Sequence, residues 1–345
     1  MAKSTGANAG TTPLKSTSAA ESTITKAAVG SSINKDHEQR GSREGSPYSA
    51  CRLCPRACGV NRERGQRGVC GASSAVRLGR AALHWWEEPC LVGEQGSGAV
   101  FFSHCPLQCV YCQNRELVAG SGIEVSPHQF EEVLLRLQNE QHAANINLVT
   151  PTHYVPSIAA ALKSLRGSGA LTIPVVYNTS SFDSLQALQL MDGLVDVYLA
   201  DFKYASALEA GKLSHAPKYP EVALAAIAEM VRQVPQWEEG EEGLLKKGVI
   251  VRHLVLPGRV QESKRALAVL NGRFGSSIRL SIMSQYTPLA SGLERYGLAG
   301  RVTEEEYEEV LDYADELGIE DYFWQQGDAA QESFVPEFNG EGVLG

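Results

Sequence analysis

Three cysteines at the spacing C-x3-C-x2-C form the stretch around which the chain is organised. Cys105, Cys109 and Cys112 follow directly after an apolar, strand-like run at residues 99–103. Thiolates hold iron–sulfur clusters, and a [4Fe–4S] cube normally takes four of them. Three cysteines without a fourth close downstream therefore indicate a cube with one open iron, where a small molecule can bind and react. The alternative is a structural zinc site that a histidine such as His104 completes.

A second group of cysteines precedes the first. Cys51, Cys54, Cys58 and Cys70 fall close together in a segment rich in Gly and Arg. This segment holds too few apolar residues to fold alone, so a bound metal would supply folding energy. Four thiolates close either a tetrahedral zinc site or a second [4Fe–4S] cluster, and the spacing leaves both open. The remaining cysteine, Cys90, is expected to be a buried, inert thiol, with a fourth cluster ligand as the alternative.

Composition limits the classes of protein to which the chain can belong. It has 345 residues, 43% of them hydrophobic, and a net charge of -9. No basic stripe is present, so nucleic acid is not expected as the primary partner. No apolar run approaches the ~18 residues that span a membrane. Because no secretory segment opens the chain, the clustered thiols indicate a reducing compartment, and we expect a cytoplasmic protein.

The first 47 residues differ from the rest of the chain. They are rich in Ser, Thr, Ala and Gly, lack any helical or strand period, and are predicted to be a disordered tail. An organelle transit peptide is the alternative, because Lys3 and Lys15 occur without nearby acidic residues. The lack of early arginine argues against it. We expect a four-cysteine metal module and connector over residues 48–95, a barrel over 96–330 and a carboxy-terminal tail over 331–345.

From residue 99 onward, short apolar strands alternate with amphipathic helices. This pattern predicts βαβ units around a parallel sheet, as either a doubly wound sheet or an open barrel. The expected strands are 99–103, 146–150, 173–178, 195–201, 249–256 and 278–284, and the expected helices are 127–142, 156–166, 182–191, 219–234, 260–271 and 303–317. Thr303 and Glu306 form a capping box at the start of the last helix.

The ends of these strands favour the barrel. Each strand ends in polar residues, and in βα barrels the chemistry lies at the carboxyl ends of the strands. Asp201 and Lys203 share one face of the fourth strand because side chains alternate along it. Arg252 and His253 on the fifth strand point to opposite faces. We therefore expect a ring of polar side chains at the barrel mouth, beside the three cysteines.

The cysteine motif, with Tyr111 before its last cysteine, resembles the signature of the radical S-adenosylmethionine (radical SAM) superfamily. Residues 48–338 resemble its branch of proteins related to pyruvate formate-lyase-activating enzymes, in stretches such as CRLCPRACGVNR, ALHWWEEPC, FFSHCPLQCVYCQN and DVYLADFKY. The resemblance implies a partial (β/α)6 radical SAM barrel and a [4Fe–4S] cluster whose open iron binds S-adenosylmethionine. In such enzymes, reductive cleavage gives methionine and a 5′-deoxyadenosyl radical, which takes a hydrogen atom from the substrate.

The resemblance also implies roles for residues around the cofactor. Tyr111 would lie against the adenine. Asn178, Thr179 and Asp201 stand where the activating enzymes place polar groups around the methionine carboxylate and a monovalent cation. Lys203 or Arg252 would pair with the cofactor's carboxylate, since a dry site must supply a charged partner.

One departure from the superfamily pattern lies after the second strand. Most members have a Gly-Gly-Glu-like turn there that holds the methionine amino group, whereas this chain has Thr-Pro-Thr-His at residues 150–153. Thr152 or His153 would take over that contact. An equally favoured alternative is that His153 is a hydrogen-bonded loop residue without a cofactor role.

Three functions remain open from the sequence. The first is activation of a glycyl radical enzyme, which requires a protein substrate. The second is radical modification of a small molecule or RNA. The third is a non-catalytic iron–sulfur or zinc protein, against which the open three-cysteine motif argues. Either radical reaction needs a reductant such as flavodoxin or ferredoxin.

Overall fold

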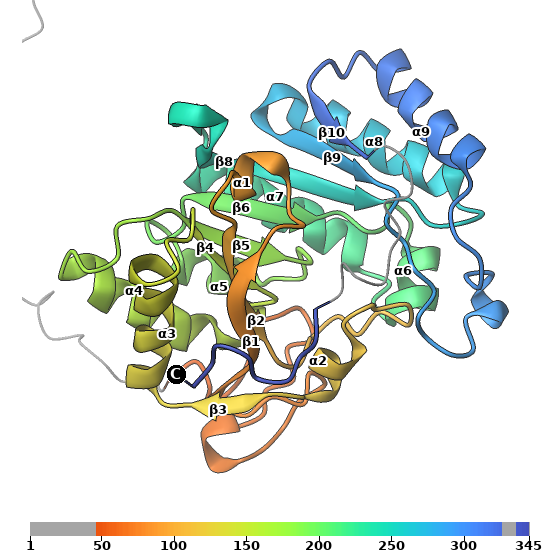
Figure 1. Cartoon of the computed structure of the whole chain (residues 1–345). Coiled ribbons are helices and arrows are strands. Elements are labelled where there is room, and N and C mark those ends of the chain that lie inside the picture. The colour runs from red at the N-terminus through yellow and green to blue at the C-terminus, as the bar shows by residue number, and fades with distance from the viewer. Residues whose placement is uncertain (1–45, 326–335, 345) are drawn as a thin grey trace, which may run out of the picture. The chain divides into compact units, whose positions relative to one another are not determined.

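A computed structural model of the chain describes residues 46–325 and 336–344 (Figure 1). Almost all of the predicted amino-terminal tail, and residues 331–335 and 345 of the predicted carboxy-terminal tail, lie outside these residues. The described residues belong to one compact unit that spans residues 45–345. None of the helices in this described part is both long enough and apolar enough to cross a membrane.

A large sheet forms the centre of the described structure. In spatial order its strands are β3 (Ile123–Val125), β1 (Val76–His84), β2 (Ser97–Phe102), β4 (Ile146–Val149), β5 (Val175–Thr179), β6 (Val197–Asp201), β8 (Leu245–Leu254), β9 (Arg279–Met283) and β10 (Tyr322–Trp324), and β7 (Glu238–Glu239) pairs with β8. The strands β2, β4, β5, β6, β8, β9 and β10 are parallel, while β1 and β3 are antiparallel additions at one edge and β7 pairs antiparallel with β8. The six parallel strands predicted from sequence are confirmed, in sequential order.

Helices between the parallel strands cover one face of this sheet (Figure 1). The longer ones are α3 (Pro127–Asn139), α4 (Val155–Gly167), α7 (Tyr219–Gln233), α8 (Val260–Phe274) and α9 (Glu304–Glu316), and the shorter ones are α2 (Arg115–Ala119), α5 (Leu185–Leu190) and α6 (Ala207–Ser214). The short helix α1 (Pro89–Val92) instead belongs to the connector between β1 and β2. Single 3-10 turns lie at η1 (Arg62–Arg64), η2 (Thr152–Tyr154), η3 (Glu241–Gly243), η4 (Gly275–Ser277) and η5 (Glu294–Tyr296). Each of the six predicted parallel strands is followed by a helix, as a partial (β/α)6 barrel requires.

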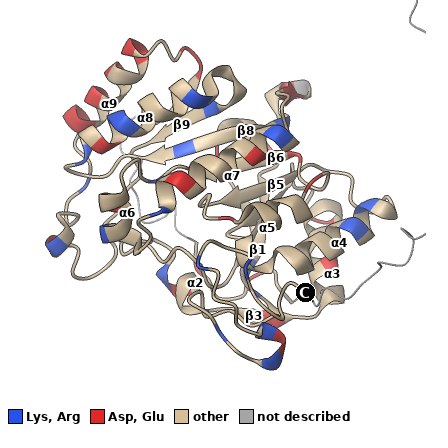
Figure 2. Ribbon diagram, turned by 180° about the vertical axis from the view of Figure 1, so that it is seen from behind, with Lys and Arg blue, Asp and Glu red and all other residues tan. Residues whose placement is uncertain are grey.

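Local sequence explains where the helices begin. Thr303 caps α9, and its capping box with Glu306 is present as predicted. Ser126 and Gln129 form a second capping box before α3, and Pro127 occupies the first turn, where a missing N–H costs nothing. Acidic residues gather on α9, whereas Lys and Arg are spread over several elements (Figure 2).

Alternation along the strands separates a helix-covered core from a barrel interior. Val175 and Tyr177 belong to the main core, whereas Val176 between them packs in a separate cluster with Leu199 and Ile250. Leu91 of α1 belongs to this second cluster and is fully buried. The connector between β1 and β2 therefore fills the part of the barrel interior that lies away from the carboxyl ends of the strands. The next inward positions along β5, β6 and β8 are Asn178, Asp201 and Arg252, which the period of two places at the carboxyl ends.

The carboxy-terminal residues 336–344 lie along the antiparallel edge. The N–H of Gly340 donates to Gly79 O (2.9 Å), and the N–H of Ala81 donates to Glu341 O (2.9 Å). Gly342 adopts a left-handed φ of +68°, and a Cβ there would lie 2.0 Å from the carbonyl oxygen of Ala81. Only glycine permits this close approach to β1.

Candidate functional site

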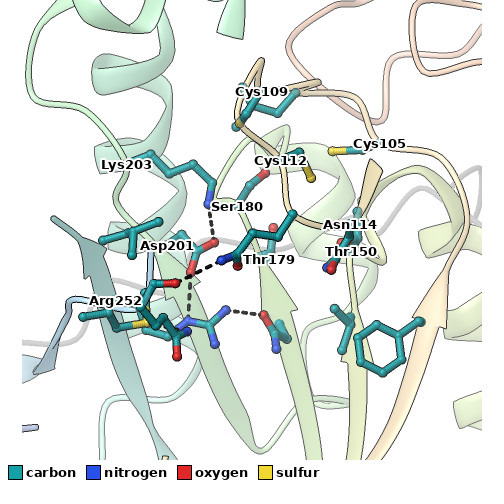
Figure 3. A pocket seen from close by; sticks show the side chains of 18 of the residues that line it. Cys105, Cys109, Cys112, Asn114, Thr150, Thr179, Ser180, Asp201, Lys203 and Arg252 are labelled. Carbon is teal, nitrogen blue, oxygen red and sulfur yellow. Dashed lines mark hydrogen bonds and ion pairs between the residues drawn. The ribbon is translucent and has the colours of Figure 1, made fainter. Parts of the chain in front are cut away.

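The loop after β2 brings three thiols to one pocket. Cys105, Cys109 and Cys112 line this pocket and face Lys203 and Asp201 across it (Figure 3). Within the loop, His104 (φ 74°) and Gln108 (φ 56°) adopt left-handed conformations. Such conformations are uncommon for residues other than glycine and persist where surrounding contacts impose them. The described geometry therefore fixes a specific turn that gathers the three sulfurs.

Each of these sulfurs accepts a hydrogen bond. The donors are the backbone N–H groups of Leu107 and Gln108 for Cys105, the Ser214 hydroxyl for Cys109 (3.1 Å) and the backbone N–H of Asn114 for Cys112. Burial raises the pKa of Cys105 to about 11 and that of Cys112 to about 12, although these donors lower it in part. Cys105 and Cys112 are thus protonated at neutral pH as free thiols, and a bound metal would drive their deprotonation.

Charged side chains from the neighbouring strand ends form the opposite wall. The guanidinium of Arg252 donates from Nε to Asp201 Oδ1 (2.8 Å) and from Nη2 to Asn178 Oδ1 (2.7 Å). Lys203 Nζ donates to Asp201 Oδ2 (2.7 Å) (Figure 3). Burial alone would raise the pKa of Asp201, but Arg252 and Lys203 together hold it below its usual value. Asp201 is therefore a carboxylate shared by two cations.

Glu87 completes this network, and sequence reasoning did not single it out. It comes from the connector that follows β1, and its carboxylate accepts from Arg252 Nη1 (2.9 Å) and from the amides of Asn147 and Asn178 (3.1 Å each). Burial raises the pKa of Glu87, with Arg252 opposing the shift. The segment ALHWWEEPC, which carries this residue, was one of the stretches that supported the family resemblance, and it was the available signal.

Aromatic residues line the pocket beside the cysteine loop. Tyr111 is buried, and its ring meets those of Tyr204 and Tyr286 edge to face, with centroids 6.4 and 6.1 Å apart. The hydroxyl of Tyr204 donates to that of Tyr111 (3.0 Å) and lies 2.7 Å from Ser214 Oγ. Because Ser214 in turn donates to Cys109, these hydroxyls connect Tyr111 to the cysteine loop.

The turn after β4 differs from the sequence-based expectation in its placement. Of residues 150–153, Thr150 lines the pocket, whereas Thr152 and His153 are buried outside its lining. Thr152 Oγ1 lies 3.5 Å from that of Thr179, which does line the pocket. His153 Nε2 lies 2.8 Å from the carbonyl oxygen of Ser103, and burial lowers its pKa to about 3. His153 thus forms a hydrogen bond at the end of β2, and a contact of Thr152 or His153 with the cofactor stays a prediction.

The four amino-terminal cysteines also form a group. Cys51, Cys54 and Cys70 are buried and Cys58 is exposed, and the other three lie close enough to Cys54 to contribute to the rise of its pKa. Their hydrogen-bond donors are Arg62 Nη1 for Cys51 (3.8 Å), the backbone N–H groups of Arg56 for Cys54 and of Val69 for Cys58 (3.4 Å), and that of Ala72 for Cys70. Burial raises the pKa of Cys54 to about 12.

The residues present fit iron–sulfur ligation at the loop. Among the described residues, no three His, Cys, Asp or Glu side chains have the spacing of a single-ion site. A cube binds each cysteine through a different iron, so its thiolates need not converge on one point. His104, the fourth ligand in the zinc alternative, does not line the pocket, and its ring packs near Gly71 and Gly120. Three thiols with hydrogen-bond donors therefore suit a cube with one iron left open.

The chain is similar in sequence or structure to several known proteins. No protein-family model matches it. It is 26% identical over 283 residues to uncharacterized protein MJ0674 of Methanocaldococcus jannaschii, covering 79% of this chain and 76% of that protein. Its structure is similar to a radical SAM methyltransferase from Sphaerobacter thermophilus (TM-score 0.47, 13% identity, 68% of this chain and 69% of the other).

It is also similar to SuiB of Streptococcus suis bound to S-adenosylmethionine (TM-score 0.43, 13% identity, 65% of this chain). The chain covers 48% of that structure, so it spans about half the length of SuiB. Structural similarity at these sequence identities does not determine an activity, so the activity has to be inferred from the residues of the site.

Proposed function

We propose that the chain is a radical SAM enzyme. The observation that carries this proposal is the shared pocket of three hydrogen-bonded thiols, Cys105, Cys109 and Cys112, and the charged ends of β6 and β8. When bound there, a [4Fe–4S] cluster with an open iron and S-adenosylmethionine supply a one-electron reductive cleavage that generates a hydrogen-abstracting 5′-deoxyadenosyl radical. A flavodoxin or ferredoxin supplies the electron.

The charged wall suits the methionine end of the cofactor. This end carries an ammonium and a carboxylate, and both need partners in a site sheltered from water. Lys203 and Arg252 offer cationic donors to the carboxylate, and Asp201 is already held between them, so its charge is compensated. With Glu87 on Arg252, this wall pairs two carboxylates with two cationic side chains. The wall can thus accept the cofactor without leaving a buried charge unpaired.

The aromatic residues serve the other end of the cofactor. Tyr111 lines the pocket within the cysteine loop, next to Tyr286, and both are largely shielded from solvent. Rings in this position pack against an adenine and exclude water from the reacting centre. Thr150, Thr179 and Asn178 line the floor and provide neutral hydrogen-bonding groups. Thr152 and His153 lie behind this floor and act by positioning it.

The reaction class is hydrogen abstraction that modifies a substrate. Activation of a glycyl radical enzyme is the finer form of the proposal, supported by the sequence resemblance alone. Modification of a small molecule or RNA is the alternative. Mixing the reduced enzyme and S-adenosylmethionine with a glycyl radical enzyme separates the two, because only the first produces the doublet spectrum of a backbone glycyl radical.

Electron paramagnetic resonance tests the site itself. Anaerobically reconstituted and reduced protein should show a [4Fe–4S]⁺ signal that changes when S-adenosylmethionine is added, since the cofactor binds the open iron. The Cys90→Ala variant is the matched control, because Cys90 is a thiol that does not line the pocket. A cluster signal that is indifferent to the cofactor in the wild type would contradict the proposal.

A further inference from the structure

The four-cysteine segment contacts the cysteine loop through one arginine. Arg56 lies between Cys54 and Cys58, and its guanidinium donates to four backbone carbonyl oxygens that belong to two other parts of the chain. These are Pro106 O (3.1 Å) and Leu107 O (3.2 Å) in the cysteine loop, and Ser214 O (2.9 Å) and His215 O (2.6 Å) at the end of α6. The ring of Phe182 lies under the same guanidinium, 5.3 Å away.

These four acceptors are close to the thiol ligands. Pro106 and Leu107 are the two residues that follow Cys105 in the loop. Ser214 is the residue whose hydroxyl donates to Cys109 Sγ. Arg56 therefore fixes both the backbone between two proposed ligands and the hydrogen-bond donor of one of them.

A second link joins the same two regions. The side-chain amide of Gln108 donates to Val69 O (2.7 Å), and the N–H of Val69 donates to Cys58 Sγ (3.4 Å). Gln108 has a left-handed φ of 56°, so this contact also holds a backbone conformation that most residues avoid. The turn of the cysteine loop is thus supported by the four-cysteine segment at both Arg56 and Val69.

The chemistry of arginine suits this position. The last carbonyl groups of a helix have no partners within the helix, and a cation near them is favourable. The planar guanidinium presents five N–H donors in a fixed fork and can serve carbonyls from two segments at once. A lysine ammonium keeps the charge but not this fork.

We infer that Arg56 is a positioning residue that couples the two thiol sites: metal binding at Cys51, Cys54, Cys58 and Cys70 orders the C-x3-C-x2-C loop through it. The inference rests on the proposed metal-binding function of both sites. A short segment with few apolar residues gains its order from the metal. Among the described contacts, Arg56 is the only charged side chain of this segment that donates to the cysteine loop, so it transmits this order to the loop. Such coupling is reciprocal, so each filled site favours filling of the other.

The test separates the coupling from the radical reaction. In a variant with Cys105, Cys109 and Cys112 replaced by Ala, an iron–sulfur cluster can be reconstituted at the four-cysteine segment alone, and amide hydrogen exchange of residues 105–114 is measured with and without the cluster. We expect the cluster to slow this exchange by about 5-fold or more. Adding Arg56→Met should abolish the slowing. Adding Arg52→Met, which removes an exposed arginine of the same segment, should leave it unchanged.

Every outcome decides the inference. Equal slowing in the Arg56→Met and Arg52→Met proteins would overturn it, as would a bound cluster without slowing when Arg56 is present. Failure of the four cysteines to bind a cluster would remove the metal site and the coupling with it. Arg56→Lys, which keeps the charge, provides a second variant if Arg56→Met fails to fold and should give intermediate slowing. Failure of the wild type to cleave S-adenosylmethionine would contradict the proposed function without affecting this exchange measurement.

Discussion

Substitution of Asp201 by Asn tests the charged wall of the pocket. The change keeps the shape of the side chain and removes its charge. Asp201 lies 2.7 Å from Lys203 Nζ and 2.8 Å from Arg252 Nε, and the three side chains are 15%, 19% and 13% exposed. The variant therefore leaves two largely buried cations facing a neutral amide.

The magnitude follows from these distances. At an effective dielectric constant of about 20, unit charges at such separations attract by about 6 kcal/mol, most of which offsets the cost of burying them. Removing one partner of a buried ion pair costs about 3–5 kcal/mol. Arg252 keeps Glu87 as a partner, so the loss falls mainly on Lys203, and we expect about 3 kcal/mol.

Urea unfolding of the metal-free protein at pH 7 measures this loss. The control is Glu124→Gln, which removes the exposed ion pair with Arg77 and should cost less than about 1 kcal/mol. Because Arg252 and Lys203 hold the pKa of Asp201 below its unfolded value of about 3.9, its contribution is present above that pH and disappears as the pH falls further. A free energy of unfolding equal to that of Glu124→Gln would refute the reasoning.

The remaining predictions concern other parts of the site. Asp201→Ala should weaken binding of S-adenosylmethionine in a direct binding assay while both metal sites keep their metal, and an unchanged affinity would make Asp201 purely structural. Burial lowers the pKa of His153 to about 3, so stability should fall as the pH drops below about 6.5, and His153→Gln should reduce this dependence in urea unfolding between pH 7 and 4. The buried guanidinium of Arg62 donates to two backbone carbonyl groups, and Arg62→Met should cost about 3 kcal/mol or more, whereas the exposed Arg64→Met in the same turn should cost little in the same assay. Metal analysis of the variant without the three loop cysteines should leave about four irons or about one zinc per chain on the amino-terminal cysteines, and no remaining metal would contradict that site.

The parallel core of the fold could be predicted because its signals are local. Short apolar runs and amphipathic helices alternate regularly, and capping residues such as Thr303 mark helix starts. The inward direction of Asp201 and Arg252 follows from the period of two, and the shared face predicted for Asp201 and Lys203 agrees with their 2.7 Å contact.

The antiparallel edge was missed because its pairing is non-local. Strand β1 contains Arg77, Gly79 and Arg80, which interrupt a simple alternation, and β3 has only three residues. The packing favours glycine at residue 79, since a Cβ there would lie 2.4 Å from a methyl group of Leu117, far along the chain. No local pattern reveals that residues 336–344 will pair with this strand.

Within the site, sequence reasoning found residues at strand ends and overlooked those that arrive from connectors. Glu87 enters the barrel interior from the segment before α1, and Arg56 reaches the cysteine loop from a different cysteine group. Their roles depend on long-range contacts that neither spacing nor periodicity encodes. The turn after β4 shows the same limit, because the left-handed φ of Thr150 (63°) decides which side chain meets the pocket.

Release of 5′-deoxyadenosine tests the central claim most directly. Anaerobically reconstituted wild-type protein, given S-adenosylmethionine and dithionite, should release 5′-deoxyadenosine and methionine in equal amounts. Cys109→Ala should abolish this release, because it removes a cluster ligand, whereas Cys90→Ala, outside the pocket, should retain it. Absence of 5′-deoxyadenosine from a wild-type protein with a filled cluster, or undiminished release from Cys109→Ala, would contradict the radical SAM assignment.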